Sequence, residues 1–360
     1  MKQKPKILVV GSGIIGASIA LSCISLGADV VVLEKNRLGG AASSNSFGWI
    51  NASFAESPAY FDLRNAAVNA FRNLKTELNL DDSVSWQGTL WWEDRGHELK
   101  KQFYNLLNRG YVAKLLNKDE IKNLEPNLKD VPEAAIFTPL EGSAEADQVA
   151  LTMLAKLTDE GGKVISSCTV EGLQFKKDRV SSVQTSIGKM SCDMVVLATG
   201  AAAQNGLVGC EWKLPMQNKK GLIVQTSPVP ELINHILMTN DVHFRQNVDG
   251  TLIVGEIFSG DFNENTFALD LASDVLLRVS KKLDFSKNLI PINIKIGTRP
   301  VPIDGFPVVG EIKGHNGVFV AIMHSGVTLA PLIGQLLASE MIETSKTPLL
   351  ELFRPSRFVD

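Results

Sequence analysis

Three closely spaced glycines mark the first place in this sequence where a ligand could bind. Gly11, Gly13 and Gly16 lie in the segment GSGIIG, between an apolar run and a segment with helical spacing. The first glycine permits a tight turn, the second lets the backbone approach a pyrophosphate, and the third lets helix and strand pack closely. The N-terminus of the helix would then face a phosphate. Alone, this motif does not separate a dinucleotide site from an ordinary glycine turn.

Glu34 strengthens the dinucleotide interpretation because it ends the next apolar run, residues 29–33. A carboxylate at this position can accept hydrogen bonds from both hydroxyls of an adenosine ribose. The alternative is a solvated residue at the end of a strand. NAD and FAD proteins share this fingerprint, so these residues predict a dinucleotide without choosing between the two.

The elements that would position this site form a β-α-β unit, with a strand at 6–10, a helix through residue 26 and a strand at 29–33. The segment 37–53 is rich in small residues and too long for a tight connection, so we expect a binding loop. Further helices are predicted near residues 59–79, 97–108, 118–124, 146–162, 266–283 and 326–343, with strands between them.

Composition limits the class of protein. A chain of 360 residues is long enough for two domains, and its net charge of −3 gives no general attraction for nucleic acid. The four cysteines form no CxxC pair, so neither a metal site nor a disulfide framework is expected. No segment has the roughly 18 uninterrupted apolar residues of a membrane span. We expect a cytoplasmic protein, and leave open peripheral association with the inner face of a membrane and assembly into a homo-oligomer.

Three later segments indicate FAD rather than NAD. They are the loop GGAASS after Glu34, the strand DMVVLATG that ends at Gly200, and the tail segments RPVPIDGFPVVG and HSGVTLAP. With them the sequence resembles, over nearly its whole length, the D-amino-acid oxidase superfamily, which includes glycine oxidase, sarcosine oxidase and D-amino-acid dehydrogenase. The resemblance implies an α/β fold in which a Rossmann-type FAD-binding domain (1–83, 144–213 and 295–360) is interleaved with an α+β substrate domain (84–143 and 214–294) containing a mainly antiparallel sheet.

The resemblance also implies which residues contact FAD. The glycine motif would bind the diphosphate, Glu34 the ribose and Val170 the adenine, while the other segments would contact diphosphate and flavin. The full set is Gly11, Ser12, Gly13, Ile14, Ile15, Gly16, Glu34, Lys35, Gly40, Ala41, Ala42, Ser43, Ser44, Val170, Ala198, Thr199, Gly200, Ser325, Gly326, Val327 and Thr328. Some relatives attach flavin through a cysteine near the tail, but this chain has none after Cys210, so noncovalent FAD is expected.

Substrate residues follow from the same resemblance. Arg299, in GTRP, would bind a substrate carboxylate with its planar fork of donors, and a surface salt bridge is the alternative. His243 occupies a position where glycine-oxidase-like members carry a tyrosine, and an exposed strand histidine is the alternative. Arg245 shares its face of the strand and is either a second carboxylate partner or, as we favour, a solvated arginine. His324 would lie beside the flavin.

Aromatic and basic residues near these positions are less specific. Trp49 and Asn51 are expected to line the pocket, whereas at least one of Trp91 and Trp92 is expected in the core. A lysine above a flavin can promote reaction with oxygen, but Lys219 and Lys220 are interpreted as a solvated pair.

The implied reaction is oxidation of the CH–NH bond of a small amino acid or N-substituted amino acid. Hydride would pass to flavin N5, the imino acid would hydrolyse, and oxygen or another acceptor would take the electrons. A 2-hydroxy-acid or polyol dehydrogenase on the same fold is one alternative. A noncatalytic FAD-binding or assembly protein is the alternative from another class.

Overall fold

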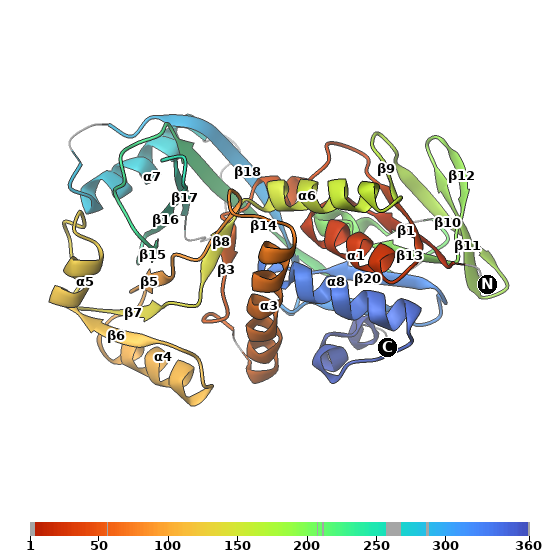
Figure 1. Cartoon of the computed structure of the whole chain (residues 1–360), viewed down its shortest axis with the longest axis horizontal. Helices are drawn as coiled ribbons and strands as arrows, with labels where there is room; N and C mark the ends of the chain where they lie inside the picture. Colours follow the sequence, from red (N-terminus) through yellow and green to blue (C-terminus); the bar gives the residue numbers. More distant parts are fainter. Residues whose placement is uncertain are drawn as a thin grey trace.

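The structure is a computed structural model that describes residues 4–55, 57–206, 208–210, 212–256, 268–285 and 288–358. Figure 1 shows a molecule of two halves, with both chain ends in the same half. The helices of that half include α1 (Ile14–Ser25), α6 (Ala146–Asp159) and α8 (Gly326–Ile342). The other half contains α4 (Gly96–Asn108), α5 (Lys118–Leu124) and α7 (Ala268–Lys282).

The half with the chain ends is built on a six-stranded sheet, ordered β19-β20-β13-β1-β2-β9. All neighbouring pairs are parallel except β19 with β20. Its strands are β1 (Lys6–Val10), β2 (Asp29–Leu33), β9 (Lys163–Ile165), β13 (Met194–Leu197), β19 (Val308–Glu311) and β20 (Val318–Ile322). The predicted β-α-β unit is therefore present, and strands from three distant parts of the chain join it.

Each face of this parallel sheet is covered by a different layer. On β1, Ile7 and Val9 pack into the cluster formed with α1, α6 and α8. Leu8 and Val10 point the other way, toward a three-stranded antiparallel sheet. That sheet contains β10 (Val170–Lys176), β11 (Arg179–Thr185) and β12 (Gly188–Ser191). Because β1 is covered on both faces, its four buried residues, Ile7 to Val10, are all apolar.

The second half contains an eight-stranded sheet, ordered β18-β14-β17-β16-β15-β5-β7-β6, in which only β15 and β5 are a parallel pair. Its strands are β5 (Thr89–Trp91), β6 (Lys114–Asn117), β7 (Ala134–Thr138), β14 (Met216–Thr226), β15 (Ile236–Met238), β16 (Val242–Gln246), β17 (Leu252–Glu256) and β18 (Pro291–Pro302). The two long strands β14 and β18 run toward the parallel-sheet half in Figure 1.

Alternation along β16 decides which of its side chains can serve a site. Val242 and Phe244 are buried in the cluster that includes residues of α5 and α7. Successive side chains of a strand point to opposite faces, so His243 and Arg245 face away from that cluster. A mainly antiparallel second sheet was expected from the sequence, and this expectation is confirmed.

The remaining elements are a long helix, a small sheet and four short helices. The helix α3 (Pro58–Glu77) packs against α8, and a small sheet contains β3 (Trp49–Ile50), β8 (Gly142–Ala144) and β4 (Val84–Ser85). Short helices are α2 (Ala41–Ser44), η1 (Gly200–Asn205), η2 (Pro348–Phe353) and η3 (Pro355–Phe358). The segment 37–53, which was predicted as a binding loop, thus contains a helical turn and a short strand that the sequence pattern did not indicate.

Several features lay beyond the sequence patterns. Strands β12, β15 and β19 were not identified individually, and the domain boundary proposed at residue 295 falls inside β18. The predicted start of a helix at residue 266 lies outside the described residues. Among the described residues, α7 begins at Ala268. Within the described part of the chain, no helix is both long and apolar enough to cross a bilayer. All four cysteines are buried free thiols.

Candidate active site

The turn from β1 into α1 has a shape that only glycine allows. Gly11 has a φ of +107°, and a Cβ there would lie 2.5 Å from the carbonyl oxygen of Ala198. A Cβ on Gly16 would overlap the carbonyl of Gly11 itself. Gly13, the N-cap residue of α1, has no side chain of its own over the end of the helix. The turn therefore keeps backbone at its surface, as approach of a pyrophosphate requires.

The predicted small-residue loop lies directly against this turn. Gly40 has a φ of +74°, and a Cβ on it would come within 2.6 Å of the Cα of Gly13. Ser43 Oγ accepts a hydrogen bond from the Ile14 backbone N–H at 3.1 Å. With Ala198 against Gly11, the structure brings together three segments whose residues were predicted to contact FAD, namely 11–16, 40–44 and 198–200. The cradle is made of glycine backbone and hydroxyl groups, which suits a diphosphate.

Glu34 joins the phosphate turn to the segment expected near adenine. Its Oε2 accepts hydrogen bonds from the backbone N–H and the hydroxyl of Ser12, both at 2.9 Å, and its Oε1 accepts one from Asn36 N–H. The Cys168 N–H donates to the Glu34 carbonyl, which brings the start of β10 at Val170 close by. Glu34 is only 8% exposed, so the alternative of a solvated strand end is wrong. The side chain of neighbouring Lys35 is exposed.

The tail loop also reaches this region. Thr328 Oγ1 accepts from Asn51 N–H and donates to the Trp49 carbonyl, each at 3.2 Å. The Tyr60 hydroxyl donates to Ser325 Oγ at 2.9 Å. Gly326 lies against Ile15 of α1, and the half-buried Val327 follows it. The first turn of α8 therefore links the predicted flavin-contacting residues 324–328 to both the phosphate turn and residues 49–51.

Arg299, His243 and His324 come from three different strands or loops, yet the charge of Arg299 acts on both histidines. Burial, and then the positive charge of Arg299, lowers the pKa of His243 to about 3. Burial, followed by the charges of Arg299, Arg64 and Lys219, lowers the pKa of His324 to about 4. The His324 side chain keeps an accessible face, although enough protein surrounds it for desolvation to be the largest cause. Both imidazoles are therefore neutral near pH 7 beside a permanent cation.

His243 is packed rather than exposed, contrary to the alternative considered from the sequence. Its side chain is 7% exposed, and its ring lies edge-on to Phe47 with 4.7 Å between centroids. A Cβ on Gly255, its cross-strand neighbour, would overlap the ring. Its Nδ1 is buried without a hydrogen-bond partner among the described residues. An unpartnered nitrogen this deep is unusual in a folded protein.

Arg245 has a different environment from both sequence-based interpretations. Its Nη2 forms an ion pair with Glu145 Oε1 at 2.6 Å, its Nε donates to the Phe47 carbonyl at 2.8 Å, and its Nη1 donates to Asn247 Oδ1. The arginine is 2% exposed, so solvation, the favoured interpretation, is wrong. The hypothesis of a second substrate-carboxylate ligand gains no support, because a protein carboxylate already holds this guanidinium.

Trp49 and Asn51 lie beside the tail loop but are tied mainly to protein groups. Trp49 Nε1 donates to Thr89 Oγ1 at 2.9 Å. The Asn51 carbonyl and side-chain oxygen both accept from Arg64, a buried residue of α3 that the sequence reading missed. The sequence feature that could have identified Arg64 is a charged residue on the apolar face of a predicted helix. Trp91 and Trp92 are both buried, as expected for at least one.

Glu141 is a second residue that the sequence reading missed. This fully buried carboxylate accepts hydrogen bonds from the N–H groups of Ala52 and Ser53 at 3.3 and 3.1 Å, and from the hydroxyl of Tyr111 at 3.2 Å. Burial, and then the charge of Glu141, raises the pKa of Tyr111. Glu141 therefore fixes the chain just after Asn51.

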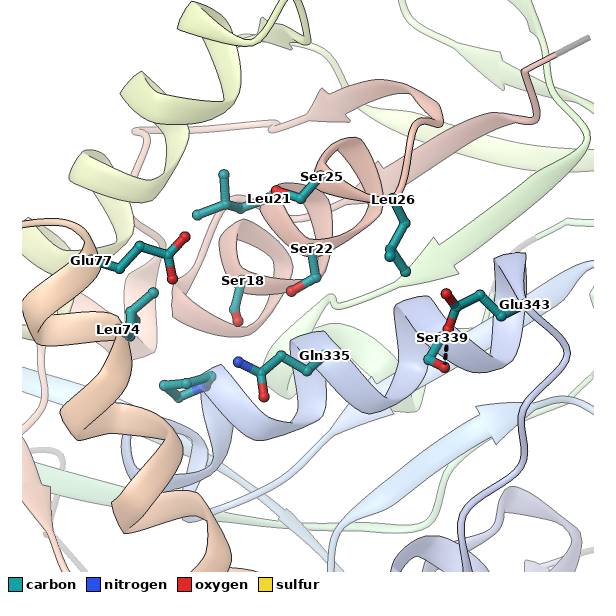
Figure 2. A pocket seen from close by; sticks show the side chains of 11 residues that line it. Ser18, Leu21, Ser22, Ser25, Leu26, Leu74, Glu77, Gln335, Ser339 and Glu343 are labelled. Atoms are coloured by element: carbon teal, nitrogen blue, oxygen red, sulfur yellow. Dashed lines mark hydrogen bonds between the residues drawn. The ribbon is translucent and has the colours of Figure 1, made fainter.

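Two cavities lie apart from Arg299, His243 and His324, and the second of them borders the loop at 40–44. One of about 250 Å³, shown in Figure 2, lies between α1, α3 and α8; serines of α1, Gln335 of α8 and Glu77 of α3 line it. Another, of about 210 Å³, borders α2 and β18 and is lined by residues that include Ser44, Asp147 and Lys295. Neither is lined by Arg299 or the two histidines. No cluster of metal-binding side chains occurs in the described ranges.

A parallel sheet that ends in a glycine turn at a helix N-terminus defines the dinucleotide-binding class of α/β proteins. Comparison with known proteins narrows this class. The chain matches the family described as FAD dependent oxidoreductase (DAO) over residues 6–340, and it belongs to that family. The protein is accordingly an FAD-dependent oxidoreductase.

Individual relatives are similar over almost the whole chain. A glycine oxidase from Geobacillus kaustophilus is 24% identical over 361 residues, spanning 96% of this chain and 95% of that protein. Sarcosine oxidase subunit beta from Rhodobacter capsulatus is 24% identical over 390 residues, spanning 100% and 91%. The crystal structure of L-proline dehydrogenase from P. horikoshii has a TM-score of 0.87 and 25% identity, and the match covers 99% of this chain and 98% of that one.

Proposed function

We propose that this protein oxidises the CH–NH bond of a small amino acid or an N-substituted amino acid. The observation that carries the proposal is the position of Arg299, a half-buried guanidinium that acts on two neutral histidines beside the tail loop. A planar fork of N–H donors suits a carboxylate. The names of the similar glycine oxidase, sarcosine oxidase subunit and L-proline dehydrogenase each include an amino acid, which supports this substrate class.

The proposal includes noncovalent FAD. The glycine turn at 11–16 and the loop at 40–44 would hold the diphosphate, Glu34 the ribose, and the start of β10 the adenine. A Cβ at Gly11 would clash with the Ala198 carbonyl and one at Gly40 with Gly13, so only glycine lets these three segments pack closely enough to present their backbone together to a diphosphate. All four cysteines are buried, and burial raises the pKa of Cys23 to about 12, so attachment through a reactive thiolate is disfavoured.

In the proposed mechanism, Arg299 fixes the substrate carboxylate and thereby orients the carbon that carries the amine. His243 and His324, with pKa values of about 3 and about 4, are uncharged at neutral pH. Neither adds a charge near the substrate amine, and each can accept a hydrogen bond from it. Bound FAD supplies the hydride acceptor. The imino acid then hydrolyses in water, and oxygen or another acceptor takes the electrons.

The experiment that tests this function is anaerobic mixing of the purified protein with glycine, sarcosine, L- and D-proline, other D- and L-amino acids and 2-hydroxy acids. Bleaching of the flavin band by amino acids, with release of ammonia or an amine, is the expected result. Bleaching by hydroxy acids alone would show a hydroxy-acid dehydrogenase. A flavin that none of these compounds reduces would indicate a binding or assembly protein. Flavin left in the pellet after acid precipitation would contradict noncovalent attachment.

Substitution of Arg299 tests the carboxylate clamp itself. Arg299→Lys keeps the charge but loses the fork, and Arg299→Ala loses both. We expect the efficiency of flavin reduction by an amino acid to fall by roughly a hundredfold or more in Arg299→Ala, and by less in Arg299→Lys. The matched control is the decarboxylated amine, which should be almost indifferent to either change. Equal losses for amino acid and amine would show that Arg299 supports the fold or the flavin instead.

A further inference from the structure

Arg299 has a second basic residue directly across the sheet. In the antiparallel pair of β14 and β18, Lys219 is the register partner of Arg299. Residues directly opposite in such a pair have Cβ atoms about 4.5–5.5 Å apart and project from the same face. Lys219 and Arg299 are therefore adjacent bases on one surface.

Lys219 and Arg299 share the face of the sheet against which Ser44 and Asn45, at the end of the predicted small-residue loop, are packed. On β18, Lys295, Gly297 and Arg299 are each two residues apart, so their side-chain positions lie on the same face. Lys295 Nζ donates to the Ser44 carbonyl at 2.7 Å, and a Cβ on Gly297 would lie 2.7 Å from Cβ of Asn45. Lys219 follows the same alternation, so its side chain projects on the side of the proposed active site. Lys220, the next residue, projects from the opposite face.

Like charges directly opposite in a sheet repel each other, and a bound anion would reduce this repulsion. The Lys219 side chain is exposed and has no ion pair with any residue in the described ranges. Its charge nevertheless reaches the site, because it contributes to the lowered pKa of His324. Arg64, the third cation that acts on His324 besides Arg299 and Lys219, already donates hydrogen bonds to the carbonyls of Asn51 and Phe54.

We infer that the site takes amino acids with a second acidic group. Arg299 would hold the carboxylate beside the reacting amine, and Lys219 would attract the second carboxylate of an amino dicarboxylate. This inference rests on the proposed function and deepens it, because it makes Lys219 a determinant of specificity. A flexible ammonium group suits a second carboxylate whose distance varies with the length of the substrate.

The test compares matched substrates in the FAD-loaded enzyme, namely aspartate with asparagine, glutamate with glutamine, and iminodiacetate with sarcosine, in both stereoisomers where these exist. We expect the parent to favour the diacid of at least one pair. Lys219→Met should lower that preference roughly tenfold or more by raising KM for the diacid, as loss of a charged contact would. The neutral partner should change little. Lys220→Met is the matched control and should keep the parent preference.

A binding measurement separates this inference from the proposed function. Succinate should perturb the flavin absorption spectrum at lower concentration than its monoamide, succinamate, and Lys219→Met should remove the difference. If no amino acid reduces the flavin but this difference is found, the proposed function fails and the anion pair stands. An equal diacid preference in the parent and Lys219→Met, in both measurements, would overturn the inference. The same loss in Lys220→Met would also overturn it, because the effect would then reflect net charge.

Discussion

At the scale of single residues, Glu34 has more than one role. Its carboxylate bridges Ser12 in the phosphate turn and Asn36 after β2, so it shapes the turn in addition to its proposed contact with the ribose. Removing it would leave the buried Ser12 N–H without its acceptor, which adds a desolvation cost to any lost ligand contact.

We predict that Glu34→Ala weakens FAD binding by roughly ten- to a hundredfold, because a charge-assisted hydrogen bond contributes about 1.5–3 kcal/mol. Fluorescence titration of the apoprotein with FAD measures the dissociation constant. Glu171→Ala, which removes an exposed carboxylate from nearby β10, is the control and should bind FAD as the parent does. A folded Glu34→Ala protein with parental affinity would show that the ribose is held by other groups.

His243 predicts a specific dependence of stability on pH. Its pKa falls to about 3 in the folded protein, below its ordinary value of 6.5, so the unfolded chain takes up a proton first as the pH drops. The stability due to neutral His243 is therefore complete above about pH 6.5 and is lost as the pH falls toward its folded pKa.

The measurement is urea unfolding with saturating FAD at pH 7.5 and 5.0. The parent should unfold at lower urea at pH 5.0, and the difference between the two midpoints should be smaller in His243→Asn. His97→Asn, at an exposed position, should keep the parent difference. A variant with the full parent difference would place the acid sensitivity elsewhere, with His324 the next candidate.

At the scale of elements, one hydrogen bond ties α2 to β18. Lys295 makes this bond to Ser44, adjacent to the Ser43 hydroxyl that receives the Ile14 N–H. We predict that Lys295→Met raises the FAD dissociation constant roughly three- to tenfold, because α2 loses about 1 kcal/mol of restraint. The rate of FAD release on dilution is the measurement, with Lys281→Met on the exposed face of α7 as control. An unchanged release rate would mean that the packing of Gly297 against Asn45 suffices.

Sequence patterns located the elements whose own residues determine their form. The β-α-β unit at 6–33 and helices such as 58–77 were identified because apolar periodicity and glycine constraints are local properties. Short strands such as β15 and β19 were not identified individually, because three or four residues carry too little periodicity. The environments of Arg245 and Glu34 depend on partners 100 and 22 residues away, so sequence alone could not give them. The roles assigned to FAD contacts, and the division into domains, stay predictions.

At the scale of the whole molecule, the proposed cofactor site draws on segments from both ends and the middle of the chain. A ligand that binds the folded protein alone stabilises it by about 2.7 kcal/mol at a concentration one hundred times its dissociation constant. We predict that added FAD raises the thermal unfolding midpoint of the apoprotein by several degrees, in a concentration-dependent way. Calorimetry with FAD, and separately with NAD, measures this. An equal rise with NAD would contradict selective binding of FAD.

The packing of α8 on α1 has a consequence for synthesis on the ribosome. The first helix of the chain packs against the last long one, and β20 pairs with β13 to extend the sheet that β1 begins. A nascent chain therefore holds α1, with its glycine turn, for most of translation before its partner emerges. Until then, the apolar surface of α1 that α8 will cover is exposed to other chains. We expect FAD to be acquired only after release from the ribosome, and chaperones to protect the N-terminal half in the interval.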